Sequence, residues 1–122
     1  MGNVNWTAVG AAWLAAALLG VVCYGRRAVP RTPLWQHALA AALLLVCAVM
    51  IGHMFDRVGA ATLAAKPWLY AMMSGGLALT FVGPALIITA VRREQKIALA
   101  LFDACTFLAA FLAMGAMFAL FA

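Results

Sequence analysis

The sequence predicts an all-α integral membrane protein whose four transmembrane helices form an up-down bundle. The chain has 122 residues, of which 69% are hydrophobic and 9% are charged. About a quarter of the residues of a soluble domain are charged, so this chain has too few to cover a water-exposed surface. Its apolar residues fall into four runs that are long enough to span a bilayer, and its eight basic residues all lie between these runs.

Each of the four runs meets the length of about 20 residues that a helix needs to cross the hydrocarbon core. The runs cover residues 6–24, 34–55, 68–91 and 97–121. Aromatic side chains that favour the membrane interface stand near the ends of the runs, at Trp6, Tyr24, Trp35, Trp68 and Tyr70. Because a backbone in lipid must satisfy its own hydrogen bonds, we expect the runs to be helices of a single transmembrane domain covering residues 1–122.

The connections between the runs are short and differ in charge. The first and third connections, residues 25–33 and 92–96, contain six basic residues, namely Arg26, Arg27, Arg31, Arg92, Arg93 and Lys96. The middle connection, residues 56–67, contains Arg57 and Lys66, is mildly apolar and suits a short interfacial helix. Since Lys and Arg are enriched in cytoplasmic loops, we expect a bacterial inner membrane with the two basic connections on the cytoplasmic side. Both termini then lie on the outer, periplasmic side.

Two features predict how the helices pack. Small residues recur at four-residue spacing on one face of the first helix, at Ala8, Ala12, Ala16 and Gly20. Such a stripe lets two helix backbones approach closely in lipid. Gly83 and Pro84 predict a kink in the third helix, because proline lacks an N–H and displaces the carbonyl one turn earlier. A kink of this kind shapes packing in many membrane proteins and lines substrate sites in some transporters.

His37 and Asp103 are polar residues inside predicted helices, where ionisable side chains are rare and often functional. Asp103 lies about 10 Å into the fourth helix at 1.5 Å per residue. His37 lies near the start of the second helix, so we expect the two side chains at comparable depth. They form a candidate proton relay, since histidine titrates near neutrality. The alternative is a structural hydrogen bond, or a histidine that faces the interface.

Every methionine after the first residue falls in the outer half of the predicted bundle. The candidate metal ligands are Met50, His53 and Met54 on the second helix and Met72 and Met73 on the third, with Met114 and Met117 in reserve on the fourth. Cys47 shares a helix face with Met50 and Met54. Thioether, thiolate and imidazole ligands suit Cu(I), so the pattern is a candidate copper site. The alternative is that these methionines fill gaps in an apolar core.

A b-type haem is a second cofactor hypothesis. His37 and His53 are sixteen residues apart, which is about 24 Å along a helix, and they point to nearly opposite faces. One chain therefore cannot ligate a haem with both histidines. The haem would need a methionine as its second ligand, or a histidine from another subunit.

The remaining patterns restrict the class of function. The sequence contains no GxSxG, no HExxH and no phosphate-binding glycine loop, and Cys23, Cys47 and Cys105 form no CxxC pair. The basic residues lie in short segments between apolar runs, whereas a nucleic-acid-binding protein would carry them along one folded surface. This pattern argues against nucleic-acid binding. The leading hypothesis is a non-enzymatic accessory or structural subunit of a larger membrane complex, in contact with lipid and with other membrane subunits or copies of itself. The alternatives are a small homo-oligomeric transporter or channel, and a protein that handles Cu(I) or haem.

Overall fold

The computed structural model describes residues 4–25 and 33–122. The elements in chain order are α1 (Trp6–Gly25), α2 (Leu34–Val58), α3 (Ala60–Ala65), α4 (Trp68–Leu77), the π-helical turn η1 (Ala78–Val82), α5 (Gly83–Arg92) and α6 (Ile97–Leu120). Because α4, η1 and α5 join into one span, the chain has four helical spans that are long and apolar enough to cross a membrane. The prediction of an all-helical chain with four long apolar helices packed as a bundle is confirmed, and the four candidate spans indicate an integral membrane protein.

The helix ends lie close to those predicted, with α2 extending three residues further, to Val58. The middle connection contains the short helix α3. Gly59 separates α2 from α3 with a φ of 93°, a backbone conformation that glycine adopts without strain. The arginines of the first connection, Arg26, Arg27 and Arg31, lie outside the described residues.

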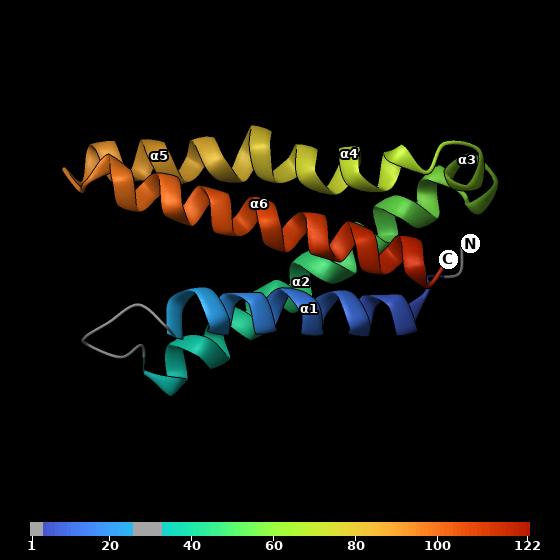
Figure 1. Cartoon of the computed structure of the whole chain (residues 1–122), viewed down its shortest axis with the longest axis horizontal. Helices are drawn as coiled ribbons and strands as arrows, with labels where there is room; N and C mark the ends of the chain where they lie inside the picture. The colour runs from blue at the N-terminus through green and yellow to red at the C-terminus, as the bar shows by residue number, and fades with distance from the viewer. Residues whose placement is uncertain (1–3, 26–32) are drawn as a thin grey trace.

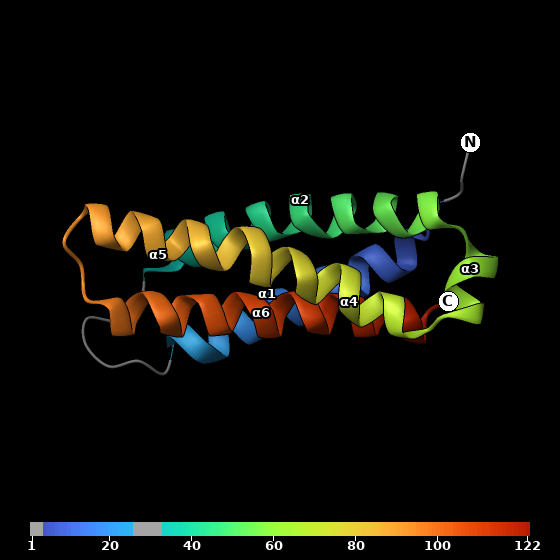
Figure 2. The same ribbon diagram turned by 90° about the horizontal axis from the view of Figure 1, so that it is seen from above.

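Consecutive spans run in opposite directions and form an open bundle (Figure 1). α6 lies at its centre, with α4, η1 and α5 on one side and α1 on the other. α2 packs mainly against α1 and crosses the bundle obliquely, so that its first turns diverge from α5 while its last turns approach α4 (Figures 1 and 2). The bundle is therefore better closed at the α3 end than at the opposite end.

Asn5 ties the two ends of the chain together. Its side-chain oxygen accepts a hydrogen bond from the backbone N–H of Ala8 at 3.1 Å, which caps the first turn of α1. Its Nδ2 donates to the carbonyl oxygen of Phe121 at 2.7 Å, just beyond the end of α6. The described ends of the chain therefore lie at the same end of the bundle as α3 (Figure 1). Which side of the membrane this end faces stays a prediction.

Two glycines lie at tight contacts between spans. A methyl group added to Gly115 of α6 would collide with Ser74 Oγ and lie 2.6 Å from the carbonyl oxygen of Tyr70, both on α4. A methyl group added to Gly52 of α2 would lie 2.9 Å from Val9 Cγ2 of α1. Small residues allow such contacts in lipid, where van der Waals packing is a main source of helix association.

The third span contains a π-helical turn immediately before Gly83 and Pro84. Thr80 in this turn directs its hydroxyl back to the carbonyl oxygen of Gly76 at 2.6 Å. Gly83 is buried, and a methyl group there would lie 3.8 Å from Ala104 Cβ of α6. The irregular backbone is thus positioned where the third span packs against α6.

Glu94 connects α5 to α6 in a left-handed backbone conformation, with a φ of 55°. The N–H of the next residue, Gln95, donates to the carbonyl oxygen of Ala90 at 2.9 Å, as in the glycine-terminated ends of many helices. A side chain in this conformation costs about 1 kcal/mol, so Glu94→Gly should raise the free energy of unfolding by up to that amount. Denaturant unfolding in micelles measures the change. A Gln95→Gly variant is the control, and an equal gain there would contradict the backbone explanation.

Candidate functional site

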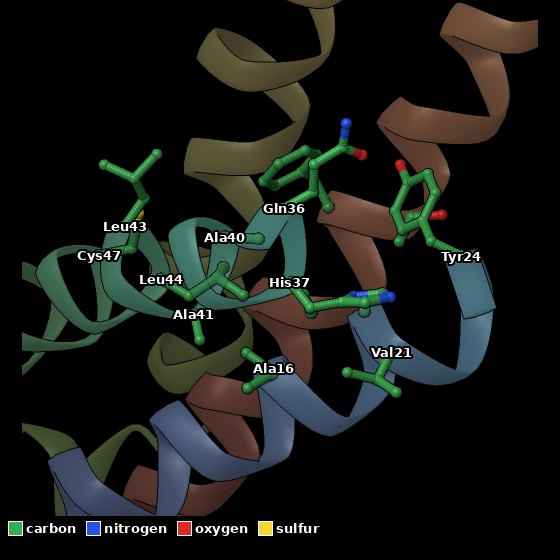
Figure 3. Close-up of a pocket in the computed structure, with 15 residues that line it drawn as sticks. Ala16, Val21, Tyr24, Gln36, His37, Ala40, Ala41, Leu43, Leu44 and Cys47 are labelled. Atoms are coloured by element: carbon green, nitrogen blue, oxygen red, sulfur yellow. The ribbon is translucent and has the colours of Figure 1, made fainter. Parts of the chain in front are cut away.

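A pocket of about 380 Å³ lies between α1, α2 and α6 (Figure 3). Its lining residues on α1 and α2 come from the second half of α1 and the first half of α2, in the half of the bundle farther from α3. Most of its lining side chains are apolar, and many are alanine or glycine. Small lining residues come from all three helices, among them Ala16 and Gly20 of α1, Ala40 and Ala41 of α2, and Ala110 of α6. Its volume lies within the range of about 300–1,000 Å³ that is usual for small-molecule sites.

The pocket exists because the first half of α2 diverges from the bundle. Every residue from Leu34 to Cys47 is at least partly exposed, and Ala48 is the first buried residue of the helix. Midway along, the indole Nε1 of Trp13 donates a hydrogen bond of 2.8 Å to the carbonyl oxygen of Ala41. This bond joins α1 to α2 where they cross. Beyond the crossing, alanine side chains are too small to fill the space between the helices.

Polar side chains gather at the end of the pocket formed by the last turn of α1 and the first turn of α2. They are Tyr24, Gln36 and His37, and in Figure 3 the imidazole of His37 points from α2 toward α1, between Val21 and Tyr24. The Tyr24 hydroxyl donates a hydrogen bond of 2.5 Å to Asp103 Oδ1 on α6. One end of an otherwise apolar pocket can therefore form hydrogen bonds.

The sequence did not identify Tyr24 as part of this cluster. Aromatic residues at the ends of transmembrane runs usually anchor in the interface, and that interpretation accounted for its position. Tyr24 instead turns inward to Asp103 and also stacks edge-on against Phe102, with ring centroids 5.7 Å apart. The signal available in the sequence was the isolated intramembrane carboxyl group, which needs a hydrogen-bond donor from some neighbouring helix.

His37 and Asp103 both lie at this end of the bundle, but they do not pair directly. His37 lines the pocket, whereas Asp103 accepts from Tyr24. In the part of the chain that the structure describes, no hydrogen bond or ion pair joins the two side chains. A direct transfer of a proton between them has no support here, and a relay through further groups stays a prediction.

The candidate copper ligands have very different surroundings. Met50 and Met72 are 61% and 52% exposed, so they face outward from the single chain. Met114 is fully buried in the core, and Met73 and Met117 are partly buried against it. Met54 is partly buried. Copper binding stays a prediction, and a Cu(I) titration against a competing chelator tests it. Affinity that falls in a Met50→Leu, His53→Ala variant would support the site.

His53 lies on the exposed surface of α2, where its ring meets Trp6 edge-on at a centroid distance of 6.4 Å. His37 lies near the opposite end of the same continuous helix. The two histidines are therefore as far apart as the sequence indicated, and no single haem spans them. The haem hypothesis still needs a second ligand from another residue type or another chain, and it stays a prediction.

The residues predicted to pack lie at helix contacts. Ala8, Ala12 and Ala16 are fully buried on α1, which packs against both α2 and α6. Gly20 is half-buried and lines the pocket, beyond the close part of the crossing. Gly83 is buried against α6, while Pro84 is exposed at the start of α5. Three of the four small residues therefore lie in a helix contact, and the fourth, Gly20, lines the pocket.

A second hollow, of about 560 Å³, lies at the α3 end of the bundle. Asn5, Asp56 and Tyr70 contribute its polar atoms, among apolar residues of α2, α3 and α6. Both hydrogen-bonding groups of the Asn5 side chain are already engaged in holding the chain ends. The pocket between α1, α2 and α6 is therefore the better candidate site.

No protein-family model, curated protein or solved structure matches this chain. A function is therefore inferred from the geometry described above.

Proposed function

We propose that this protein is a small non-enzymatic subunit of a larger membrane assembly, and that the first half of α2 is its docking surface. The observation that carries the proposal is the lack of any buried residue between Leu34 and Cys47. In α6, by contrast, buried residues are distributed along the helix from Ala100 to Phe118. A helix that leaves its own bundle over half its length is available to pack with a helix of another subunit.

The composition of this surface supports helix docking. Ala38 and Ala42 are exposed and four residues apart, so they form a small-residue pair on the side of α2 that does not line the pocket. Pairs of this kind permit close helix approach in lipid. Larger apolar side chains, Leu39 and Val46, stand beside them and supply contact area. We propose that the assembly lies in a bacterial inner membrane with the α3 end facing outward.

Photo-crosslinking in native membranes tests the docking surface. A photoreactive amino acid is placed at Val46 of α2 or at Leu79 of η1, which are 65% and 66% exposed. We expect the Val46 probe to form a discrete adduct with another membrane polypeptide, and the Leu79 probe to label lipid. Ala38→Phe should abolish the adduct, whereas Ala85→Phe on the exposed side of α5 should not. Lipid labelling at both positions, with a monomer after purification, would overturn the proposal.

Orientation is tested separately by cysteine labelling. In a chain with its own cysteines replaced by serine, Ala60→Cys should react with an impermeant maleimide added to whole cells of an expression host whose outer membrane has been permeabilised. Glu94→Cys should react only after the inner membrane is opened, because the basic connections are predicted to be cytoplasmic. The reverse pattern would invert the topology.

A small homo-oligomeric transporter is a second candidate, favoured by the π-helical turn of the third span. Irregular turns of transmembrane helices are frequent at functional sites. Purification in mild detergent separates the two candidates. Larger partner subunits in the purified complex support the accessory role, and a stable homo-oligomer supports transport.

A further inference from the structure

We propose that the pocket between α1, α2 and α6 binds an uncharged amphipathic molecule drawn from the membrane, with a carbonyl-bearing head group on an apolar tail. Quinones with an apolar tail are the chemical class that fits this description. The proposal goes beyond the subunit role and does not depend on it, because the pocket is built within one chain.

The mouth of the pocket determines how a ligand reaches it. Val21 of α1 and Ala40 and Leu43 of α2 line the pocket and are also exposed on the surface of the span. The opening therefore faces lipid, and a ligand that enters there must be soluble in the hydrocarbon core. The alanines deeper in the pocket leave room for an apolar tail without offering it a polar partner.

The polar end of the pocket determines the head group. Gln36 and His37 line the pocket, and within the described part of the chain their side chains form no hydrogen bond. An amide N–H and an imidazole N–H both donate to a carbonyl oxygen. A ligand carbonyl that enters the pocket would therefore accept a hydrogen bond from one of these donors.

The pocket lining selects against an anionic head group. None of the described residues that line the pocket is Lys or Arg, so an ionised carboxylate would lie there without a counter-charge. Burying an unpaired carboxylate costs far more than burying a neutral polar group, whereas the carbonyl of a quinone is uncharged.

The test measures binding of a benzoquinone with a decyl tail to the purified chain in phosphatidylcholine nanodiscs. Equilibrium dialysis against empty nanodiscs removes the contribution of simple partitioning. Ala40→Phe places a large side chain in the mouth, and Ala38→Phe is the matched control two residues away on the opposite side of α2. His37→Leu removes a head-group donor without blocking the mouth. Helix content and a monodisperse elution profile establish that each variant is folded.

We expect saturable binding of one quinone per chain, weakened at least tenfold by Ala40→Phe and about tenfold by His37→Leu, which corresponds to about 1.4 kcal/mol. Ala38→Phe should bind as the unmodified chain does, and decanoic acid should bind more weakly than the quinone. Absence of saturable binding, or equal loss in Ala40→Phe and Ala38→Phe, would overturn the proposal. Equal affinity for decanoic acid, insensitive to His37→Leu, would overturn the assigned head group.

Discussion

Gly115→Ala should lower the free energy of unfolding by about 2 kcal/mol, within the usual range for overpacking a close contact. The added methyl group would meet Ser74 Oγ and lie 2.6 Å from the backbone oxygen of Tyr70. The serine hydroxyl is itself fixed by its hydrogen bond of 2.6 Å to that same oxygen. Since neither atom belongs to a flexible side-chain end, α4 and α6 must move apart. Unfolding by SDS titration, followed by circular dichroism, measures the loss.

Gly76→Ala is the matched control for this change, because a methyl group at Gly76 meets nothing within 4 Å. Both glycines lie inside helices, so each substitution gains up to about 1 kcal/mol of helix propensity. Gly76→Ala should therefore leave stability unchanged or raise it. Ser74→Ala should recover part of the loss in Gly115→Ala but not all, since the Tyr70 carbonyl stays in place. Equal stability of the Gly115→Ala and Gly76→Ala variants would refute the close crossing.

Tyr24→Phe should lower the free energy of unfolding by about 2 kcal/mol, because leaving an acceptor away from water without its hydrogen-bond donor costs about 1–3 kcal/mol. The substitution keeps the ring and its contact with Phe102 while removing the hydroxyl that donates to Asp103. The carboxyl group would then lack this donor inside the membrane. The same SDS titration measures the change.

The second tyrosine of the chain provides the control. Tyr70→Phe also removes one phenolic oxygen, but the hydroxyl of Tyr70 donates no hydrogen bond among the described residues. Its loss should change stability by a few tenths of a kcal/mol at most. Asp103→Asn keeps an oxygen acceptor for Tyr24 and should cost less than Tyr24→Phe. Tyr24→Phe can also be measured in a chain that already carries Asp103→Leu. If it lowered the free energy of unfolding there as much as in the unmodified chain, the assigned pairing would be wrong.

The sequence predicted the spans well because hydrophobic length is a local property. Four apolar runs gave four helices, and the short helix α3 occupies the middle connection. The pocket could not be predicted, because it depends on the angle at which α2 crosses α1. That angle follows from contacts such as the one between Trp13 and the Ala41 carbonyl, which no sequence periodicity reveals.

The methionines illustrate the same difference. Helical spacing correctly indicates that Met50 and Met54 lie near one face of α2, but spacing does not say which neighbours that face meets. Met50 is exposed, while Met114 on α6 is fully buried. Shared depth in the membrane therefore did not imply shared surroundings. Tyr24 is the converse case, since its position at a run end concealed a contact with another helix.

The π-helical turn at Ala78–Val82 has a consequence for the length of the third span. A π-helical turn holds one residue more than an α-helical turn, and each residue of an α-helix advances the face by about 100°. The wide turn absorbs the surplus residue without the rotation of about 100° that the residue would cause in a regular helix, so Gly83 and Ala90 are buried on α5 as Ser74 and Gly75 are on α4. Deleting one of the exposed residues Leu79–Phe81 would leave a regular helix with both halves still directed at α6. Deletion of one residue between Pro84 and Ala90 would turn Ala90 away from α6. Within the third span, only a deletion in the π-helical turn should therefore be tolerated.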